Sequence, residues 1–326
     1  MKIIKKPWIK LKETIDDEDY ELINTLQQKC IEVDQTTLKL ELDYKRGASS
    51  ENNRGSSIKQ INEFMYFDGQ EIIGYIGIGS FGDANAPIEV NGMVHPEYRR
   101  QGVFKTLSEL VIEEWKRRNS CSMLLLSDRK SKSGQKFIQG TGAKYKNSEY
   151  DMYLKEDNLE LLQRPLYGIT LKKATNVDAG EVARQNRIYF NHEVEDSKSD
   201  LNDNKSDSIS ADEETTIQTE GMILPEEEEK RGMTIYLAEK DEQIIGKVHI
   251  QLTSGIGGIY GLGVLPEYRG KGFGRAILIM AIEKLREAKA REIMLQVAAE
   301  NNNALGLYKS CGFVETSTMD YYEMKV

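Results

Sequence analysis

One stretch of the sequence combines glycines and basic side chains at a spacing suited to binding an anion. It reads LPEYRGKGFGRA over residues 265–276, where a proline ends a β-rich run and a helical pattern begins after Gly272. Such a junction presents unpaired backbone N–H groups at the positive end of a helix dipole. Arg269, Lys271 and Arg275 add positive charge. The stretch therefore predicts a phosphate or pyrophosphate site, with a purely structural glycine turn as the alternative.

Two familiar nucleotide-binding loops do not fit this spacing. A P-loop needs Ser or Thr after its lysine, and neither follows Lys271. A dinucleotide-binding fingerprint needs a third glycine where this chain has Arg275. The pattern that does fit is R/Q-x-x-G-x-G/A, which is filled by Arg269, Gly272 and Gly274.

With this pattern the chain resembles the GCN5-related N-acetyltransferase (GNAT) family. A second stretch, LQVAAENNNALGLYKSCGF over residues 295–313, is similar to the family signature L-x-V-x-x-x-N-x-x-A-x-x-L-Y-x-x-x-G-F, and its asparagine lies 27 residues after Gly274. The resemblance implies an α/β (α+β) fold, in which helices flank a mixed, mainly antiparallel sheet with two middle strands splayed apart. It also implies acetyl-CoA as the cosubstrate and an amine as the acetyl acceptor.

The resemblance assigns roles to individual residues. The pyrophosphate of acetyl-CoA is expected on the turn formed by Arg269, Gly270, Lys271, Gly272, Phe273 and Gly274. The pantetheine arm is expected to pair, like an added strand at an open sheet edge, with the backbone of Leu262, Gly263 and Val264. Asn301 is expected to hydrogen-bond the cofactor, although a helix N-cap explains the same residue.

Tyr308 is the expected general acid, again by resemblance. A phenol carries a proton at neutral pH and can release it to the leaving thiolate, although a tyrosine that only packs in the core is the simpler alternative. The attacking amine must also lose a proton, and the receiving group is left open. Gln296 stands where some relatives carry a glutamate and cannot act as a base, which leaves Glu267, Glu300 or a chain of waters.

The chain contains a weaker copy of the same pattern. HPEYRRQGVFKTL over residues 95–107 repeats the later turn at an offset of 170 residues, with Phe104 in place of the second glycine. At the same offset Ile138 falls opposite Tyr308, and isoleucine cannot donate a proton. Duplication followed by divergence explains the repeat. We therefore expect an N-terminal GNAT domain with a degenerate signature over residues 1–158 and a C-terminal GNAT domain over residues 159–326.

Each half shows the same order of elements. In the second half, strands are expected from GITLKKA, MTIYLAEK, EQIIGKVHI, GGIYGLGV, EIMLQVAA and TMDYYEMKV, and helices from VDAGEVARQNRIYF, from the residues after Gly272 and from NNALGLYKSC. In the first half, helices are expected from DDEDYELINTLQQKC and VFKTLSELVIEEWKRR. These runs follow the helical period of 3.6 residues or the alternation of strands.

Composition limits the kind of protein. The net charge of −9 comes from residues 191–230, which hold 14 acidic residues and three lysines, and the rest of the chain is close to neutral. This segment is expected to be a flexible, solvated insertion, with an acidic rim for cationic acceptors as the alternative. No basic stripe indicates nucleic acid, no apolar run indicates a membrane helix, and the three cysteines indicate neither disulfides nor a metal site. The expected location is the cytoplasm.

The leading hypothesis is an acetyl-CoA-dependent N-acetyltransferase whose C-terminal half is catalytic. Its acceptor is a small-molecule or peptide amine of unknown identity, since acceptor contacts come from variable loops. A non-catalytic acyl-CoA-binding or assembly protein is the alternative, and Tyr308 argues against it because a pure binder has no use for an acid at the thioester. A third hypothesis makes both halves active, with Glu89 or Asn91 replacing the missing groups.

Overall fold

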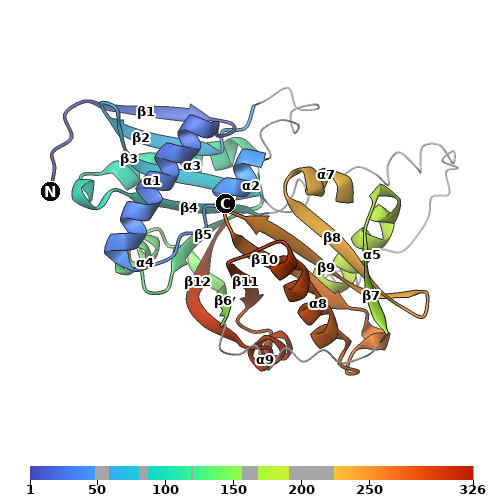
Figure 1. The fold of residues 1–326 in the computed structure, drawn as a ribbon. Coiled ribbons are helices and arrows are strands. Elements are labelled where there is room, and N and C mark those ends of the chain that lie inside the picture. Colours follow the sequence, from blue (N-terminus) through green and yellow to red (C-terminus); the bar gives the residue numbers. More distant parts are fainter. Residues whose placement is uncertain (48–58, 81–86, 119, 156–167, 191–223, 326) are drawn as a thin grey trace, which may run out of the picture. The chain divides into compact units, whose positions relative to one another are not determined.

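The computed structural model describes residues 1–47, 59–80, 87–118, 120–155, 168–190 and 224–325. They divide into two compact units (Figure 1). Unit 1 contains Met1–Met152 together with Val297–Asn302 and Glu315–Val326, and unit 2 contains Tyr153–Gln296 and Asn303–Val314. Helices flank a mixed, mainly antiparallel sheet in each unit, which confirms the predicted fold class.

The sheet of unit 1 has its strands in the order β1-β2-β3-β4-β5-β12-β6. These strands are β1 (Pro7–Lys12), β2 (Glu63–Asp68), β3 (Glu71–Ser80), β4 (Ile88–Val94), β5 (Ser122–Asp128), β12 (Phe313–Lys325) and β6 (Lys144–Leu154). Neighbours from β1 to β4 pair antiparallel, whereas β4 and β5 pair in parallel. The parallel pair requires a crossover, which the helix between β4 and β5 supplies.

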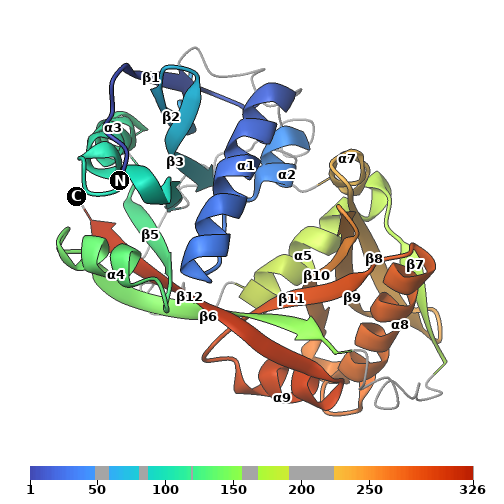
Figure 2. The ribbon, with the colours of Figure 1, turned by 60° about the vertical axis from the view of Figure 1, so that its left-hand side comes forward.

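Helices cover both faces of this sheet (Figure 2). They are α1 (Asp17–Asp34), α2 (Leu42–Gly47), the short 3₁₀ helix η2 (Pro96–Tyr98), α3 (Val103–Arg118) and α4 (Lys132–Gln139). Asp16 caps α1 by accepting from the backbone N–H of Asp19, and Ile23, Leu26 and Cys30 form its buried stripe. Helices α1 and α2 pack with the face of β2 and β3 that carries Met65 and Tyr75, and α3 and α4 pack with the opposite face.

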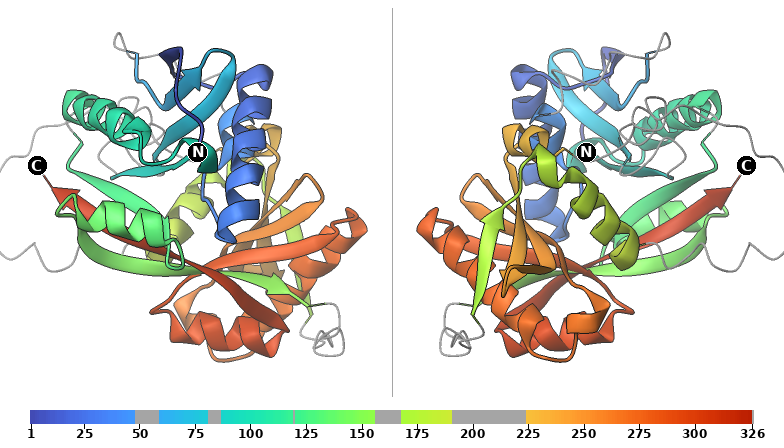
Figure 3. Two further views of the ribbon diagram at one scale, coloured as in Figure 1. Left: turned by 90° about the vertical axis from the view of Figure 1, so that its left-hand side faces the viewer. Right: turned by 90° about the vertical axis from the view of Figure 1, so that its right-hand side faces the viewer.

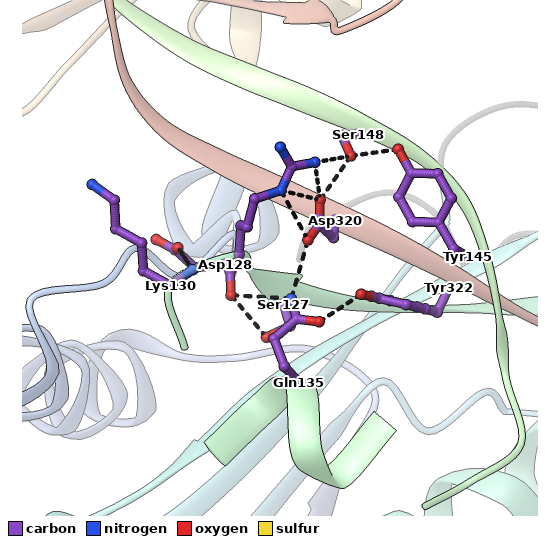
Figure 4. Close-up of polar contacts among 9 residues, drawn as sticks. Ser127, Asp128, Lys130, Gln135, Tyr145, Ser148, Asp320 and Tyr322 are labelled. Atoms are coloured by element: carbon purple, nitrogen blue, oxygen red, sulfur yellow. Dashed lines mark hydrogen bonds and ion pairs between the residues drawn. The ribbon is translucent and has the colours of Figure 1, made fainter. Parts of the chain in front are cut away.

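From Glu315 on, β12, the strand that ends the described chain, belongs to unit 1. In β12, residues 319–325 pair antiparallel with β5, and Figure 3 shows β12 between β5 and β6. Figure 4 shows the polar contacts that fix it, centred on the Asp320 carboxylate, which is buried. Asp320 accepts from Arg129 Nη2 at 2.7 Å, Ser148 Oγ at 2.7 Å and Gln135 Nε2 at 3.2 Å. The buried carboxylate of Asp320 is therefore both paired with a cation and hydrogen-bonded, as a buried charge must be.

Unit 2 repeats the layout in smaller form. Its strands, in the order β11-β10-β9-β8-β7, are β11 (Glu292–Ala298, of which residues 292–296 belong to this unit), β10 (Ile256–Val264), β9 (Gln243–Thr253), β8 (Met233–Lys240) and β7 (Ile169–Lys173). Its helices are η4 (Asn176–Asp178), α5 (Ala179–Phe190), α7 (Pro225–Lys230), η6 (Pro266–Tyr268), α8 (Phe273–Glu287) and α9 (Asn302–Ser310). In helix α8 every residue from Ala276 to Ile282 is buried.

Two sequence-based expectations change. Most of the acidic segment, residues 191–223, lies outside the described residues, but its end is not an irregular tether. Pro225–Lys230 form helix α7, which begins with a proline and has three glutamates in its first turn, both favourable at a helix N-terminus. The predicted boundary after residue 158 also falls outside the described residues, and residues 315–325, expected in the second domain, belong to unit 1.

Candidate functional site

The glycine turn of unit 2 has the backbone that an anion site requires. Gly270 and Gly272 have φ values of 74° and 81°, a left-handed conformation that side chains other than glycine adopt at a cost. Helix α8 begins directly after Gly272, and the backbone N–H of Ala276 is the donor to the Gly272 carbonyl at 3.2 Å. The N–H groups of the first turn before Ala276 have no partner within the helix.

Strand β10 leads into this turn and separates from its neighbour. Its parallel pairing with β11 runs from Ile256 opposite Glu292 to Ile259 opposite Leu295 and ends there. On its other side β10 stays paired with β9, apart from a bulge between Tyr260 and Gly263. The edge that faces β11 is therefore open over Leu262, Gly263 and Val264, the residues predicted to pair with pantetheine.

The cationic side chains of the turn are partly engaged with the protein itself. Arg269 Nε donates to the Val264 carbonyl at 2.9 Å, and Lys271 Nζ donates to the Glu267 carbonyl at 3.1 Å. Arg275 Nη1 donates to the carbonyl and hydroxyl of Ser310, so it binds the end of α9. An anion bound at this turn would therefore depend more on backbone N–H groups, and less on these side chains, than the sequence indicated.

Tyr308 lies in α9 and is 8 % exposed. Its ring contacts that of Phe313 edge-on, with centroids 6.2 Å apart. Burial raises the pKa of Tyr308 to about 12, so the phenol keeps its proton at neutral pH. The surroundings of Tyr308 are therefore compatible with both expectations. The residue is buried, as a packing tyrosine would be, and its hydroxyl is protonated, as a general acid must be.

The remaining predicted residues are divided between the units. Gly274 is the second residue of α8, and a Cβ at this position would meet Leu307 at 3.4 Å, an ordinary van der Waals contact, so the space there also admits an alanine. Asn301 lies in the segment Val297–Asn302, which belongs to unit 1, whereas Tyr308 belongs to unit 2. Glu267 and Glu300, the two candidate bases, are exposed. Their exposure fits solvated charges better than proton acceptors held in a site.

Unit 1 has the corresponding turn and, beside it, a cavity of about 420 Å³. Strand β4 separates from β5 after Val90 opposite Leu125, as β10 separates from β11. Apolar side chains line much of the cavity, among them Phe104 and Phe137, whose rings stand edge to face 4.7 Å apart. Asn91 also lines the cavity. Its side-chain atom Nδ2 is buried and has no hydrogen-bond partner among the described residues.

Sequence reasoning did not find a buried lysine beneath the bulge of β10. Lys247 in β9 has an exposed fraction of zero, and its Nζ lies 3.1 Å from His249 Nε2. Alternation along a strand gives no reason to expect a charge at such a position. The sequence signal that could have indicated it is the spacing of Lys247 and His249. Residues two positions apart in a strand place their side chains on the same face.

The family model of the GNAT acetyltransferases matches the chain twice, over residues 22–137 and 199–313. The chain belongs to the GNAT acetyltransferase family. The two matches together cover more than half of the chain, and one match falls mostly in each half. This confirms the predicted tandem arrangement.

Similar proteins include acetyltransferases and the solved structure of a tandem GNAT protein. A mycothiol acetyltransferase of Kocuria rhizophila is 37 % identical over 90 residues, which are 26 % of this chain and 30 % of that protein. This curated relative and two others are thus matched over 26 to 30 % of their length. A tandem GNAT protein from the clavulanic acid biosynthesis pathway superposes with a TM-score of 0.68 at 14 % identity, covering 98 % of both chains.

A GCN5-related N-acetyltransferase from Sphaerobacter thermophilus gives a TM-score of 0.66 at 18 % identity, over 98 % of this chain and 95 % of that one. At these identities the structural likeness establishes the fold. None of the helices in the described residues is long and apolar enough to cross a membrane.

Proposed function

We propose that the chain is an acetyl-CoA-dependent N-acetyltransferase and that unit 2 carries the catalytic site. The observation that supports this most directly is the opening of β10 away from β11 beside a left-handed glycine turn that starts α8. An extended pantetheine arm can add to the open edge, and the helix N-terminus can hold its pyrophosphate. The family's use of acetyl-CoA supplies the identity of the ligand.

The proposed reaction is direct attack of a neutral amine on the thioester carbonyl. The backbone of Leu262, Gly263 and Val264 aligns the arm, and residues 269–274 bind the pyrophosphate. As the C–S bond breaks, the hydroxyl of Tyr308 gives its proton to the departing thiolate. The acceptor is a small-molecule or peptide amine, and the name of the mycothiol acetyltransferase relatives is in keeping with a small-molecule acceptor.

The test is Tyr308→Phe, which keeps the ring beside Phe313 and removes only the transferable proton. We expect turnover to fall by roughly 10² to 10⁴, while acetyl-CoA affinity and melting temperature stay close to wild type. Acetyl-CoA and a panel of amines, followed by mass spectrometry, provide the assay and identify the acceptor. Wild-type turnover in Tyr308→Phe would show that the phenol only packs.

A second candidate function, binding of an acyl-CoA by unit 1 without transfer, is favoured by its cavity. The cavity lies beside the turn, and the unpartnered Asn91 Nδ2 offers a donor to a carbonyl oxygen. Ile138 stands at the position that Tyr308 occupies in unit 2, so a bound thioester there would lack the acid. Calorimetry with acetyl-CoA separates the cases, because two binding sites per chain support this function and one site argues against it.

A further inference from the structure

The cavity of unit 1 has two ends of different character. At one end, its mouth, it borders the turn between β4 and α3, where the exposed residues Arg100 and Lys105 line it. At the other end it reaches the apolar core that α3 and α4 form with the sheet. The side chains that line this inner end are those of Val90, Val111, Ile112, Met123, Leu125 and Met324. One cavity therefore joins a cationic mouth to an apolar interior.

The inner end extends past the point where β4 and β5 separate. Parallel pairing runs from Ile88 opposite Met123 to Val90 opposite Leu125 and ends there. The edge of β4 that begins with Asn91 is therefore open to an extended ligand arm. Met123 lies two residues before Leu125 along β5, which is about 7 Å at the rise of a strand. An arm paired with the open edge needs a further group to reach Met123.

The inner end suits an apolar guest. Two hydroxyls that line the cavity are directed to the backbone, since Ser108 Oγ donates to the Phe104 carbonyl and Thr141 Oγ1 to the Ile138 carbonyl, both at 2.7 Å. A buried water needs two to four polar partners, which the side chains of valine, isoleucine, leucine and methionine do not supply. A hydrocarbon chain, by contrast, gains dispersion contacts with such walls and leaves water.

We propose that unit 1 binds an acyl-CoA whose acyl chain is several methylenes longer than acetyl, and that the chain occupies the inner end of the cavity. This proposal rests on the second candidate function, the binding of an acyl-CoA by unit 1. The phosphates face Arg100 and Lys105 at the mouth, and the arm follows the open edge of β4. Asn91 directly follows the last paired residue of β4, and its Nδ2 donates to the thioester carbonyl. Beyond that carbonyl the acyl chain continues along apolar walls.

The aligned positions of unit 2 differ in size and polarity. The offset of 170 residues places Tyr308 opposite Ile138, so unit 2 has a hydroxyl where unit 1 has an apolar wall of the cavity. The same offset places Ile282 opposite Ile112. Ile282 is 1 % exposed, whereas Ile112 is half-buried and lines the cavity. We therefore expect the preference for a longer chain in unit 1 and not in unit 2.

The first experiment is calorimetry of the full chain with acetyl-CoA and with hexanoyl-CoA. It uses Gly272→Val, which weakens binding at the turn of unit 2 and so reduces the contribution of that unit. Each methylene that enters an apolar site strengthens binding roughly four-fold, so hexanoyl-CoA should bind about 10²-fold more tightly than acetyl-CoA. Equal affinities would overturn the proposal and leave acetyl-CoA binding by unit 1 intact. If neither compound binds, the second candidate function fails and the proposal fails with it.

The second experiment fills the inner end. Ile112→Trp places an indole where the acyl chain is expected, so the preference for hexanoyl-CoA should fall from about 10²-fold to less than about 10-fold, while acetyl-CoA binds as before. Ile3→Trp is the matched control, because Ile3 is 74 % exposed and lies outside the cavity lining. This control should keep the full preference. An Ile112→Trp protein that also keeps it would contradict the location of the chain.

A fluorescence measurement with an unaltered cavity covers the case in which Ile112→Trp does not fold. The chain has two tryptophans, Trp8 and Trp115, and both belong to unit 1. Trp115 is buried in the same core as the inner end, one turn after Val111 on α3. Trp8→Phe keeps an aromatic ring beside Phe67 and leaves Trp115 as the single indole.

The probe for this measurement is 6-bromohexanoyl-CoA. A bromine atom quenches the fluorescence of an indole close to it, so this compound should quench Trp115, whereas hexanoyl-CoA should not. Because unit 2 contains no tryptophan, quenching reports the chain in unit 1. Binding of 6-bromohexanoyl-CoA without quenching would show that the chain lies elsewhere and would refute the proposal.

Discussion

The turns that join strand to helix in the two units have the same backbone but different surroundings. In unit 1 the left-handed positions are Arg100 at φ 65° and Gly102 at φ 85°, and in unit 2 they are Gly270 at φ 74° and Gly272 at φ 81°. Replacement of a glycine by arginine has therefore left the path of the chain unchanged. The backbone conformation of the turn therefore does not depend on glycine alone. Hydrogen bonds between the turn and its surroundings also hold it.

One of those hydrogen bonds occurs in both units. The arginine before the first left-handed residue donates from Nε to the last carbonyl of the preceding strand, at 3.1 Å for Arg99 and 2.9 Å for Arg269. Arg99 also forms a bidentate pair with Asp34 at the end of α1, with N–O distances of 2.7 and 2.6 Å. We infer that the main role of Arg99 and Arg269 is to hold the shape of the turn, and that their positive charge is secondary.

The side chains that face the turn have diverged. The offset of 170 residues aligns Phe104 and Phe137 of unit 1 with Gly274 and Leu307 of unit 2. In unit 2 the small Gly274 lies beside Leu307 of α9, whereas in unit 1 two aromatic rings occupy the aligned positions. The comparison shows that the two units share the backbone of the turn, whereas the side chains packed beside it differ in size and chemistry.

The largest expected effect tests the divergence at Ile138, the residue aligned with Tyr308. Ile138 is 4 % exposed and packs with the α3 and α4 core, so Ile138→Ala should lower the free energy of unfolding by about 2 to 4 kcal/mol. Turnover per folded molecule should stay unchanged. Denaturant unfolding and acetyl transfer on the same sample provide the two readouts. Loss of turnover at full stability would place the chemistry in unit 1.

A smaller effect tests whether the two turns bind the same ligand. Gly272→Val forces a branched side chain into a left-handed position and toward the pyrophosphate, and should weaken acetyl-CoA binding by about 2 kcal/mol or more. Gly69→Val, in a hairpin at φ 62° with open space around it, is the control for backbone strain alone. Calorimetry on both variants checks this. Equal affinities in Gly272→Val and Gly69→Val would contradict the assignment of the turn.

The same substitution in the other unit, Gly102→Val, sharpens the comparison. If unit 1 also holds an acyl-CoA, this variant should lose a binding step that Gly272→Val keeps. If unit 1 holds none, Gly102→Val should match Gly69→Val in every binding measurement.

The smallest expected effect concerns the strand that completes unit 1. Asp320→Asn keeps the shape of the side chain but removes its charge beside Arg129, which is half-exposed, so solvent weakens the pair. We expect a loss of about 1 to 2 kcal/mol in the free energy of unfolding. Glu323→Gln, whose lysine partners Lys146 and Lys325 are solvent-accessible, should cost less than about 1 kcal/mol. A larger loss in Glu323→Gln than in Asp320→Asn would reverse this order.

Much of the fold was predictable because its signals are local. The glycine turn, the amphipathic stripe of α8 and the second signature lie within short stretches, and the repeat made each half a check on the other. The residues expected to bind the cofactor, except Asn301, all occur in unit 2. Their roles remain predictions.

The features that were missed depend on long-range pairing. Nothing in TMDYYEMKV indicates that this strand pairs with β5 of unit 1, because alternation specifies a strand and a buried face but no partner. Lys247 was missed for a related reason. A lysine in a strand is normally exposed, and its burial follows from the bulge of β10 and the ring of Tyr189, which come from other parts of the chain.

The position of β12 has a consequence for how the protein is made. The contact between Arg129 and Asp320 joins residues 191 positions apart, so the sheet of unit 1 is incomplete until synthesis has passed through unit 2. Until then the edges of β5 and β6 that later receive β12 present unpaired backbone groups, which invite pairing with other chains. Closing a loop of this length adds a modest entropic cost but slows the final step of folding. A ribosome-bound chain that ends within unit 2 should therefore depend on chaperones more than the finished protein does.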